Sequence, residues 1–119
     1  MPRRLGRIVA PVLAVLVSGL ILLFGLSPRV PSPLRTLSDK VTHGVGYALL
    51  AFTSAEALAV LRWGPSPPFG ALAYAAAHGA ALEAMQSYTP RRHAQWGDLL
   101  ADAVGALVGV ASWWLWRRR

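Results

Sequence analysis

The sequence predicts an all-α membrane protein, a compact bundle of four transmembrane helices that forms a single domain over residues 1–119. Two observations support this fold class. The chain is 55% hydrophobic and only 14% charged, whereas soluble domains average about 25% charged residues. Four apolar stretches also have the length, about 20 residues, that a helix needs to cross a bilayer. They lie at 7–27, 41–62, 69–89 and 97–116.

The first stretch, 7–27, contains Pro11 close to its start, where the missing backbone N–H costs little, and no ionisable residue beyond its first position. We expect this helix to span the membrane and to pack against the other helices. Three prolines follow within 28–38. Because proline opposes helix formation at its own position and at the one before it, we expect an extended loop there. Ser38 or Asp39 is then the predicted N-cap of the second helix.

The later connections and helices carry features of membrane proteins. The segment 63–68, WGPSPP, predicts a short turn, and 90–96 predicts a second loop. Gly105 and Gly109 are four residues apart, a spacing that lets membrane helices approach closely, and we expect this contact within the bundle rather than between two copies. An aromatic belt at the membrane surface is predicted for Trp113, Trp114 and Trp116.

The net charge of +7 does not indicate nucleic-acid binding, because the basic residues flank the apolar stretches instead of following one helix face. With both termini and 63–68 in the cytoplasm, seven basic residues lie inside: Arg3, Arg4, Arg7, Arg62, Arg117, Arg118 and Arg119. Five lie outside: Arg29, Arg35, Lys40, Arg91 and Arg92. The excess favours cytoplasmic termini. Since the chain has no cysteine, disulfides, thiolate metal sites and cysteine nucleophiles are excluded.

The acidic residues all lie within or beside the apolar stretches, where an ionisable group is costly unless it faces protein or water. Within each helix the polar residues recur at intervals of three or four and so share a face, as Asp39, His43 and Tyr47 do. Because neighbouring helices are antiparallel, these faces meet near one side of the membrane. We expect one pocket, formed by Asp39, Lys40, His43, Tyr47, Glu83, Gln86, Arg92, Asp98 and Asp102.

Two ionisable residues are expected outside this pocket. Glu56 lies 13 positions after His43, near the opposite membrane face, and is predicted to be interfacial or to pair near Arg62. His78 lies about 140° around its helix from Glu83, so we interpret it as a hydrogen-bonded packing residue.

Three motifs follow one another along the last three apolar stretches. They are Asp39-Lys40-x-x-His43-x-x-x-Tyr47, then Glu83-x-x-Gln86, then Arg92-x-x-x-x-x-Asp98-x-x-Ala101-x-x-x-Gly105-x-x-x-Gly109. In these motifs the chain resembles the VanZ-like family of small membrane proteins, named for a member associated with teicoplanin resistance. The resemblance implies a multi-pass protein of the bacterial inner membrane, with a link to the cell envelope and to glycopeptide tolerance.

One position departs from the family pattern. The family usually has asparagine four residues after the aspartate of the last helix, where this chain has Asp102 after Asp98. Two carboxylates one helical turn apart repel each other. We therefore expect that one of them is protonated, or that a cation lies between them, supplied by Lys40, Arg92 or a metal.

The first functional hypothesis is a membrane-embedded hydrolase or phosphotransfer enzyme. It would act on a phosphorylated polar lipid or lipid-linked envelope intermediate at the extracytoplasmic face. A histidine beside carboxylates can act as base or nucleophile, and cations suit an anionic head group. Catalysis is assigned to His43, Asp39, Glu83 and Asp98, with His43 oriented by Asp39 or Glu83. Substrate binding is assigned to Lys40, Tyr47, Gln86, Arg92 and Asp102.

Three alternatives stay open. The pocket could bind or shield a glycopeptide, lipid or envelope partner without turnover, conduct protons or ions, or lock three helices together as a polar knot. No metal site is predicted, because the ligand spacing is not specific, although a divalent cation is a candidate cofactor. We expect membrane lipids as partners and no nucleic acid, and the sequence makes no prediction of oligomeric state.

Overall fold

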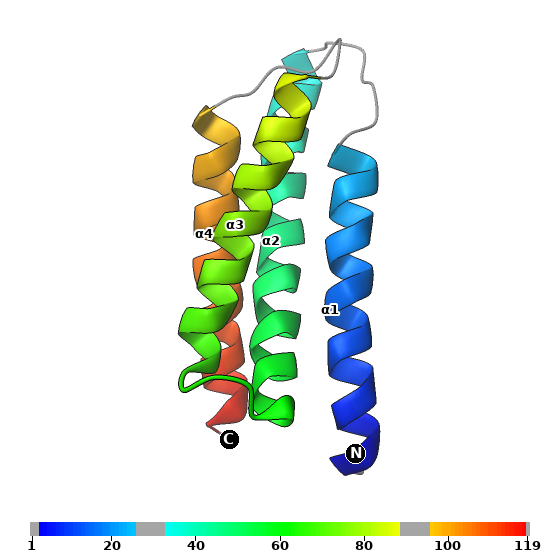
Figure 1. Ribbon diagram of the computed structural model, residues 1–119. Helices are drawn as coiled ribbons and strands as arrows, with labels where there is room; N and C mark the ends of the chain where they lie inside the picture. The colour runs from blue at the N-terminus through cyan, green and yellow to red at the C-terminus, as the bar shows by residue number, and fades with distance from the viewer. Residues whose placement is uncertain (1–2, 26–32, 89–95, 119) are drawn as a thin grey trace.

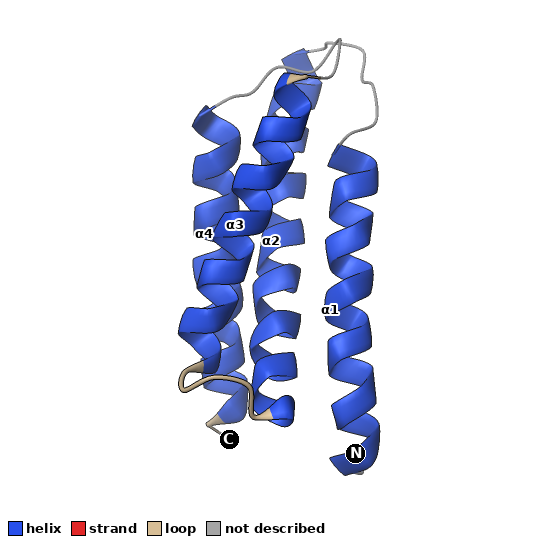
Figure 2. Ribbon diagram, viewed as in Figure 1, coloured by secondary structure: helices blue, strands red, loops and turns tan. Residues whose placement is uncertain are grey.

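The computed structural model of the chain describes residues 3–25, 33–88 and 96–118. Within them it contains four helices: α1 (Arg3–Gly25), α2 (Pro33–Leu61), α3 (Pro67–Ser87) and α4 (Trp96–Arg117). The helices form a bundle with extents of 45 × 23 × 22 Å, in which the start of α1 and the end of α4 lie at the same end (Figures 1 and 2). The all-α prediction is confirmed.

Three of these helices are long and apolar enough to cross a membrane, over Gly6–Phe24, Lys40–Leu61 and Leu99–Arg117. The third helix, α3, is not among them, because two prolines at its start and His78, Glu83 and Gln86 in its second half lower its mean hydropathy. Three candidate spans indicate a membrane protein. A fourth span formed by α3 remains a prediction.

The largest difference from the predicted helices is at the start of α2. The helix was expected to begin at 41 after an extended loop, but it begins at Pro33. In the first turn of a helix proline loses only an N–H that would be unpaired anyway, and its φ is already helical, so Pro33 starts the helix instead of preventing it. Ser38 and Asp39 therefore lie inside α2 and are not its N-cap; residues 28–32 of the expected loop lie outside the described residues.

The same effect shortens the turn between α2 and α3. This turn was expected to cover 63–68, but α3 begins at Pro67, with Ser66 as its N-cap and proline in its first turn. Arg62 and Gly64 have positive φ angles, 54° and 86°, which end α2. The other predicted ends are within four residues of those observed, except that 26–27, 89 and 90–95 lie outside the described residues.

The core lies among α2, α3 and α4. One buried cluster joins Tyr47, Leu50 and Ala51 of α2 to Ala75 of α3 and Ala106 of α4. A second, nearer the termini, contains Ala55, Ala71 and Trp113. In Figure 1 the first helix, α1, lies to one side of the other three, and most of its large apolar side chains face outward, as expected for a helix in contact with lipid.

Glycine sets the distance between α2 and α4. A Cβ atom at Gly105 would overlap the carbonyl oxygen of Gly44, and a Cβ atom at Gly109 would overlap that of Ala48. The two backbones thus touch at these positions, as small residues permit in membrane helices. The Gly-x-x-x-Gly step packs within the chain, as the sequence predicts.

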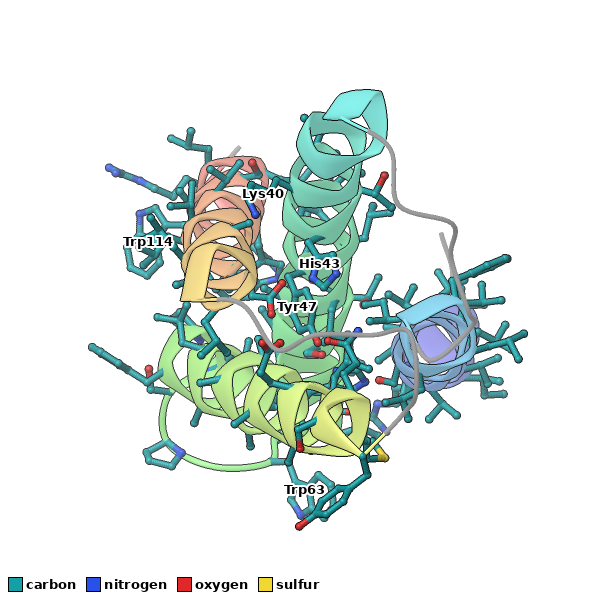
Figure 3. The ribbon with its side chains drawn as sticks, turned by 90° about the horizontal axis from the view of Figure 1, so that it is seen from above. Lys40, His43, Tyr47, Trp63 and Trp114 are labelled. Carbon is teal, nitrogen blue, oxygen red and sulfur yellow. The ribbon has the colours of Figure 1, made fainter. Side chains whose placement is uncertain are left out.

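The end of the bundle near the termini is held by an ion pair. Arg117 Nη2 and Nε donate to the two oxygens of Glu56 at 2.6 and 3.0 Å, and Trp113 Nε1 donates to Glu56 Oε2 at 2.8 Å. Glu56 thus pairs with Arg117 rather than near Arg62. Trp113 is buried and is not part of an aromatic belt, whereas Trp63 and Trp114 point outward (Figure 3).

Replacing Glu56 with glutamine is expected to lower the free energy of unfolding by about 1 kcal/mol, since the pair is charge-assisted but Arg117 is 43% exposed. Unfolding of the purified chain in detergent micelles by dodecyl sulfate measures this. Arg62→Gln is the matched control and should leave stability unchanged. An equal loss of stability in both variants would contradict the pairing with Arg117 and would mean that Glu56 pairs near Arg62.

Candidate functional site

The centre of the candidate site is a hydrogen-bonded pair of side chains, one from α2 and one from α4. His43 Nδ1 and Asp102 Oδ1 are 2.8 Å apart, and both side chains are 8% exposed. The pair lies next to the contact of Gly44 with Gly105, where the two backbones touch. This close approach lets the short aspartate side chain reach the imidazole. Figure 3 shows His43 and Tyr47 extending from α2 into the bundle.

The pair fixes which nitrogen of His43 can take part in proton transfer. When Asp102 is ionised its carboxylate only accepts hydrogen bonds, so His43 Nδ1 then carries the proton and donates a hydrogen bond to Oδ1. In the neutral ring Nε2 is then the basic nitrogen. The ring of Tyr47 lies beside the imidazole, at a centroid distance of 6.4 Å and an interplanar angle of 20°.

His43 also lines a groove between α1 and α2. The groove has a volume of about 430 Å³. Its walls are apolar and include exposed side chains, among them Leu20, Phe24 and Leu49. A histidine oriented by a carboxylate thus lies at the wall of a groove formed by the outer surface of the bundle, within reach of a molecule that comes from the side.

A second histidine continues the polar network toward α1. Tyr47 Oη lies 2.8 Å from His78 Nδ1, and His78 Nε2 lies 3.1 Å from the carbonyl oxygen of Ser18. The carbonyl only accepts, so Nε2 donates to it, and in the neutral ring Nδ1 accepts from the Tyr47 hydroxyl. Ser18 Oγ donates to Ala14, so in the 2.6 Å contact between Ser18 and Tyr74 the tyrosine hydroxyl donates. These bonds connect α1 to α3.

Removing the Tyr47 hydroxyl is expected to lower the free energy of unfolding by breaking this hydrogen-bond network, while the aromatic ring still fills its place in the core. Tyr47 is fully buried, and Tyr47→Phe would leave His78 Nδ1 without its donor, at a loss of about 1 kcal/mol. Unfolding by dodecyl sulfate measures the loss. Tyr74→Phe is the matched control, with a smaller loss expected because Tyr74 is 43% exposed. A larger loss in the control would contradict the hydrogen-bond assignment.

The structure brings together some of the predicted site residues. His43, Tyr47 and Asp102 are in contact, and Glu83 lies close enough to Tyr47 for electrostatic interaction. Gln86 is buried on α3. Lys40 lies one helical turn before His43 and extends toward α4 (Figure 3). The side chains of Asp39 and Asp98 are not among those described, and Arg92 lies outside the described residues.

One assignment changes. His43 was expected to be oriented by Asp39 or Glu83, but its described partner is Asp102, which was assigned to substrate binding. His78 was interpreted as a hydrogen-bonded packing residue, and it is indeed buried and bonded to Tyr47 and Ser18.

The described residues do not form a metal site, since no three histidine, aspartate or glutamate side chains among them lie together. Comparison of the chain with protein-family models, with curated proteins and with solved structures finds no match in any of the three. The resemblance to the VanZ-like family therefore rests on the motif residues alone and stays a prediction.

Proposed function

We propose that the chain is a VanZ-like membrane enzyme of the bacterial cell envelope, a hydrolase or phosphotransfer enzyme acting on a phosphorylated polar lipid or lipid-linked intermediate. The observation that carries the proposal is the 2.8 Å contact between His43 Nδ1 and Asp102 at the wall of the groove between α1 and α2. An aspartate that holds a histidine in one tautomer is the arrangement that prepares a general base.

The chemistry follows from this geometry. Nε2 of His43 takes a proton from water or from a substrate hydroxyl as its oxygen bonds to phosphorus. Asp102 stabilises the imidazolium that forms. As the phosphorus bond to the leaving oxygen breaks, the imidazolium returns the proton to that oxygen, so the base is restored. Lys40, on the same face of α2 as His43, would hold the phosphate together with Arg92.

The setting supports a lipid substrate. The groove beside His43 is lined by apolar side chains that also face the surroundings of the bundle, so an acyl or isoprenyl chain can lie there while its polar head reaches His43. The proposal includes α3 as a fourth span, inner-membrane location and cytoplasmic termini. Both termini lie at one end of the bundle (Figure 1), which supports an even number of membrane crossings, and His43 and Asp102 lie in the first halves of α2 and α4, away from that end.

Turnover by the purified chain in liposomes tests the proposal against a binding or shielding role. The substrates are phosphatidic acid, phosphatidylglycerol phosphate and undecaprenyl diphosphate, and the readout is phosphate released per chain. We expect many turnovers per chain for one of them. Release that stops at one equivalent, or substrate retained by the chain without release, supports the binding alternative.

A further inference from the structure

A second groove lies toward the end of the bundle that carries the two termini. Three helices form its walls, with side chains that include Pro11, Ala14, Leu58, Leu61, Phe69 and Tyr74. The turn 63–66, which connects α2 to α3 at this end (Figure 1), also lines it. The volume is about 570 Å³, larger than that of the groove beside His43, and the two grooves share no lining residue.

The walls of this groove are mostly apolar and open to the side. Val15, Leu61 and Phe69 line it, and they are 70%, 46% and 74% exposed. Apolar walls favour hydrocarbon over water. The volume is on the order of twenty times a water molecule's share of the liquid, which is space for part of one acyl chain.

The turn at the end of the groove carries an interfacial residue. Trp63 lines the groove, is 72% exposed and points outward (Figure 3). Tryptophan in membrane proteins is enriched at the level of the lipid head groups. A lipid whose chain lies in the groove would therefore have its head group beside this turn.

Two exposed arginines flank the groove at the same end. Arg62 stands between Leu61 and Trp63, which both line the groove. Arg7 lies on α1 one helical turn before Pro11, on the same helix face. Arginine binds phosphate oxygens with charge-assisted hydrogen bonds. The charge beside the groove is thus complementary to an anionic head group.

No acidic side chain that the structure describes neutralises these two arginines. Among those side chains only Glu56 lies toward this end of the bundle, and its ion pair is with Arg117. Neither Arg7 nor Arg62 forms an ion pair within the described part of the chain. Both guanidinium groups can therefore meet a phosphate.

We propose that this groove, together with Arg7 and Arg62, binds one anionic phospholipid of the membrane. An acyl chain lies in the groove, and the phosphate oxygens accept hydrogen bonds from the two guanidinium groups. The described lining residues include no histidine, aspartate or glutamate, so the lipid is bound and not converted. The site is separate from the groove where His43 is proposed to act and does not depend on that activity.

Native mass spectrometry of the full chain in a neutral detergent tests the site by the affinity for the first lipid bound. Phosphatidylglycerol is compared with phosphatidylcholine of the same acyl chains, in which a quaternary ammonium group cancels the phosphate charge. We expect phosphatidylglycerol to bind at least about tenfold more tightly. Glycerol phosphate, the head group without chains, should bind at least about 100-fold more weakly than phosphatidylglycerol.

Arginine variants test the head-group end. Arg7→Gln with Arg62→Gln should remove the preference for phosphatidylglycerol and leave the affinity for phosphatidylcholine unchanged. The matched control is Arg118→Gln, which removes an exposed positive charge of α4 outside the groove and should keep the preference.

A wall variant tests the chain end. Ala14→Phe places bulk in the groove and should weaken both phospholipids alike, at least about tenfold. The matched control is Leu13→Phe, at an exposed position of α1 outside the groove, and it should bind both lipids as the unmodified chain does.

Several results would overturn the site. Equal affinity for the two phospholipids, or an equal loss in Arg118→Gln, would mean that no specific head-group site exists. Unchanged binding in Ala14→Phe would place the chain elsewhere, and equal binding of glycerol phosphate would indicate a site for free phosphate. His43→Gln separates the two proposals, because it should abolish turnover while phosphatidylglycerol is still preferred. If no substrate is turned over, the enzyme proposal fails and the lipid site stands.

Discussion

Alanine at Gly105 or Gly109 is expected to disrupt the packing of α2 against α4 and to lower the free energy of unfolding by about 3 kcal/mol. The added Cβ would overlap a backbone carbonyl oxygen of α2, at Gly44 or Ala48, and no side-chain rotation relieves an overlap with backbone. The helices must move apart, and the core cluster around Tyr47 and Ala106 would loosen with them. Unfolding of the variants in detergent micelles by dodecyl sulfate measures the loss.

Gly19→Ala is the matched control for these substitutions. Gly19 is also in a membrane-length helix, but nothing lies within 4 Å of the position that its Cβ would take. Alanine is a better helix former than glycine by up to about 1 kcal/mol, so this variant should be as stable as the unmodified chain or slightly more stable. If Gly105→Ala matched Gly19→Ala, the close approach of α2 and α4 would be wrong.

Removal of the Asp102 carboxylate is expected to have the largest effect on turnover of any change outside His43. Asp102→Ala leaves His43 Nδ1 without its buried acceptor, so both the tautomer and the orientation of the ring are lost. We expect a loss of about 100-fold in kcat and of about 2 kcal/mol in the free energy of unfolding. Steady-state kinetics in liposomes and unfolding by dodecyl sulfate measure the two effects.

Asparagine at the same position separates hydrogen bonding from charge. The amide oxygen of Asp102→Asn can still accept from His43 Nδ1, so the tautomer is kept, while the charge that stabilises the imidazolium is lost. The expected loss in kcat is about tenfold, the difference between a charged and a neutral hydrogen bond. Equal activity in Asp102→Asn and Asp102→Ala would contradict a role for the hydrogen bond.

Much of the helical architecture could be predicted from the sequence, because membrane spans depend on runs of apolar residues, which are local. The small-residue step at Gly105 and Gly109 could also be interpreted correctly from its spacing. The start of α2 could not, because proline is compatible both with an extended loop and with the first turn of a helix, and only the complete fold distinguishes them at Pro33.

The pairing of polar residues was less predictable than their presence. Helical spacing predicted that His43, Tyr47 and Asp102 belong to one site. It could not predict which carboxylate reaches His43, because several residues share a helix face and the pairing depends on the distance between the backbones of α2 and α4. That distance is set by Gly44 and Gly105, and it made Asp102 the partner of His43. His78 was correctly interpreted as a hydrogen-bonded packing residue, but its partners Tyr47 and Ser18 could not be predicted, because they are on other helices.

The most direct test of the account compares the two buried histidines as a matched pair. His43 and His78 are both buried in the same bundle, but only His43 is paired with a carboxylate among the contacts described, whereas both ring nitrogens of His78 are used in bonds to Tyr47 and Ser18. Turnover of the lipid phosphate substrate is measured for His43→Gln and His78→Gln in liposomes. The account predicts a loss of at least about 100-fold for His43→Gln and a small loss, matched by lower stability, for His78→Gln. Equal losses in the two variants, or full activity in His43→Gln, would contradict it.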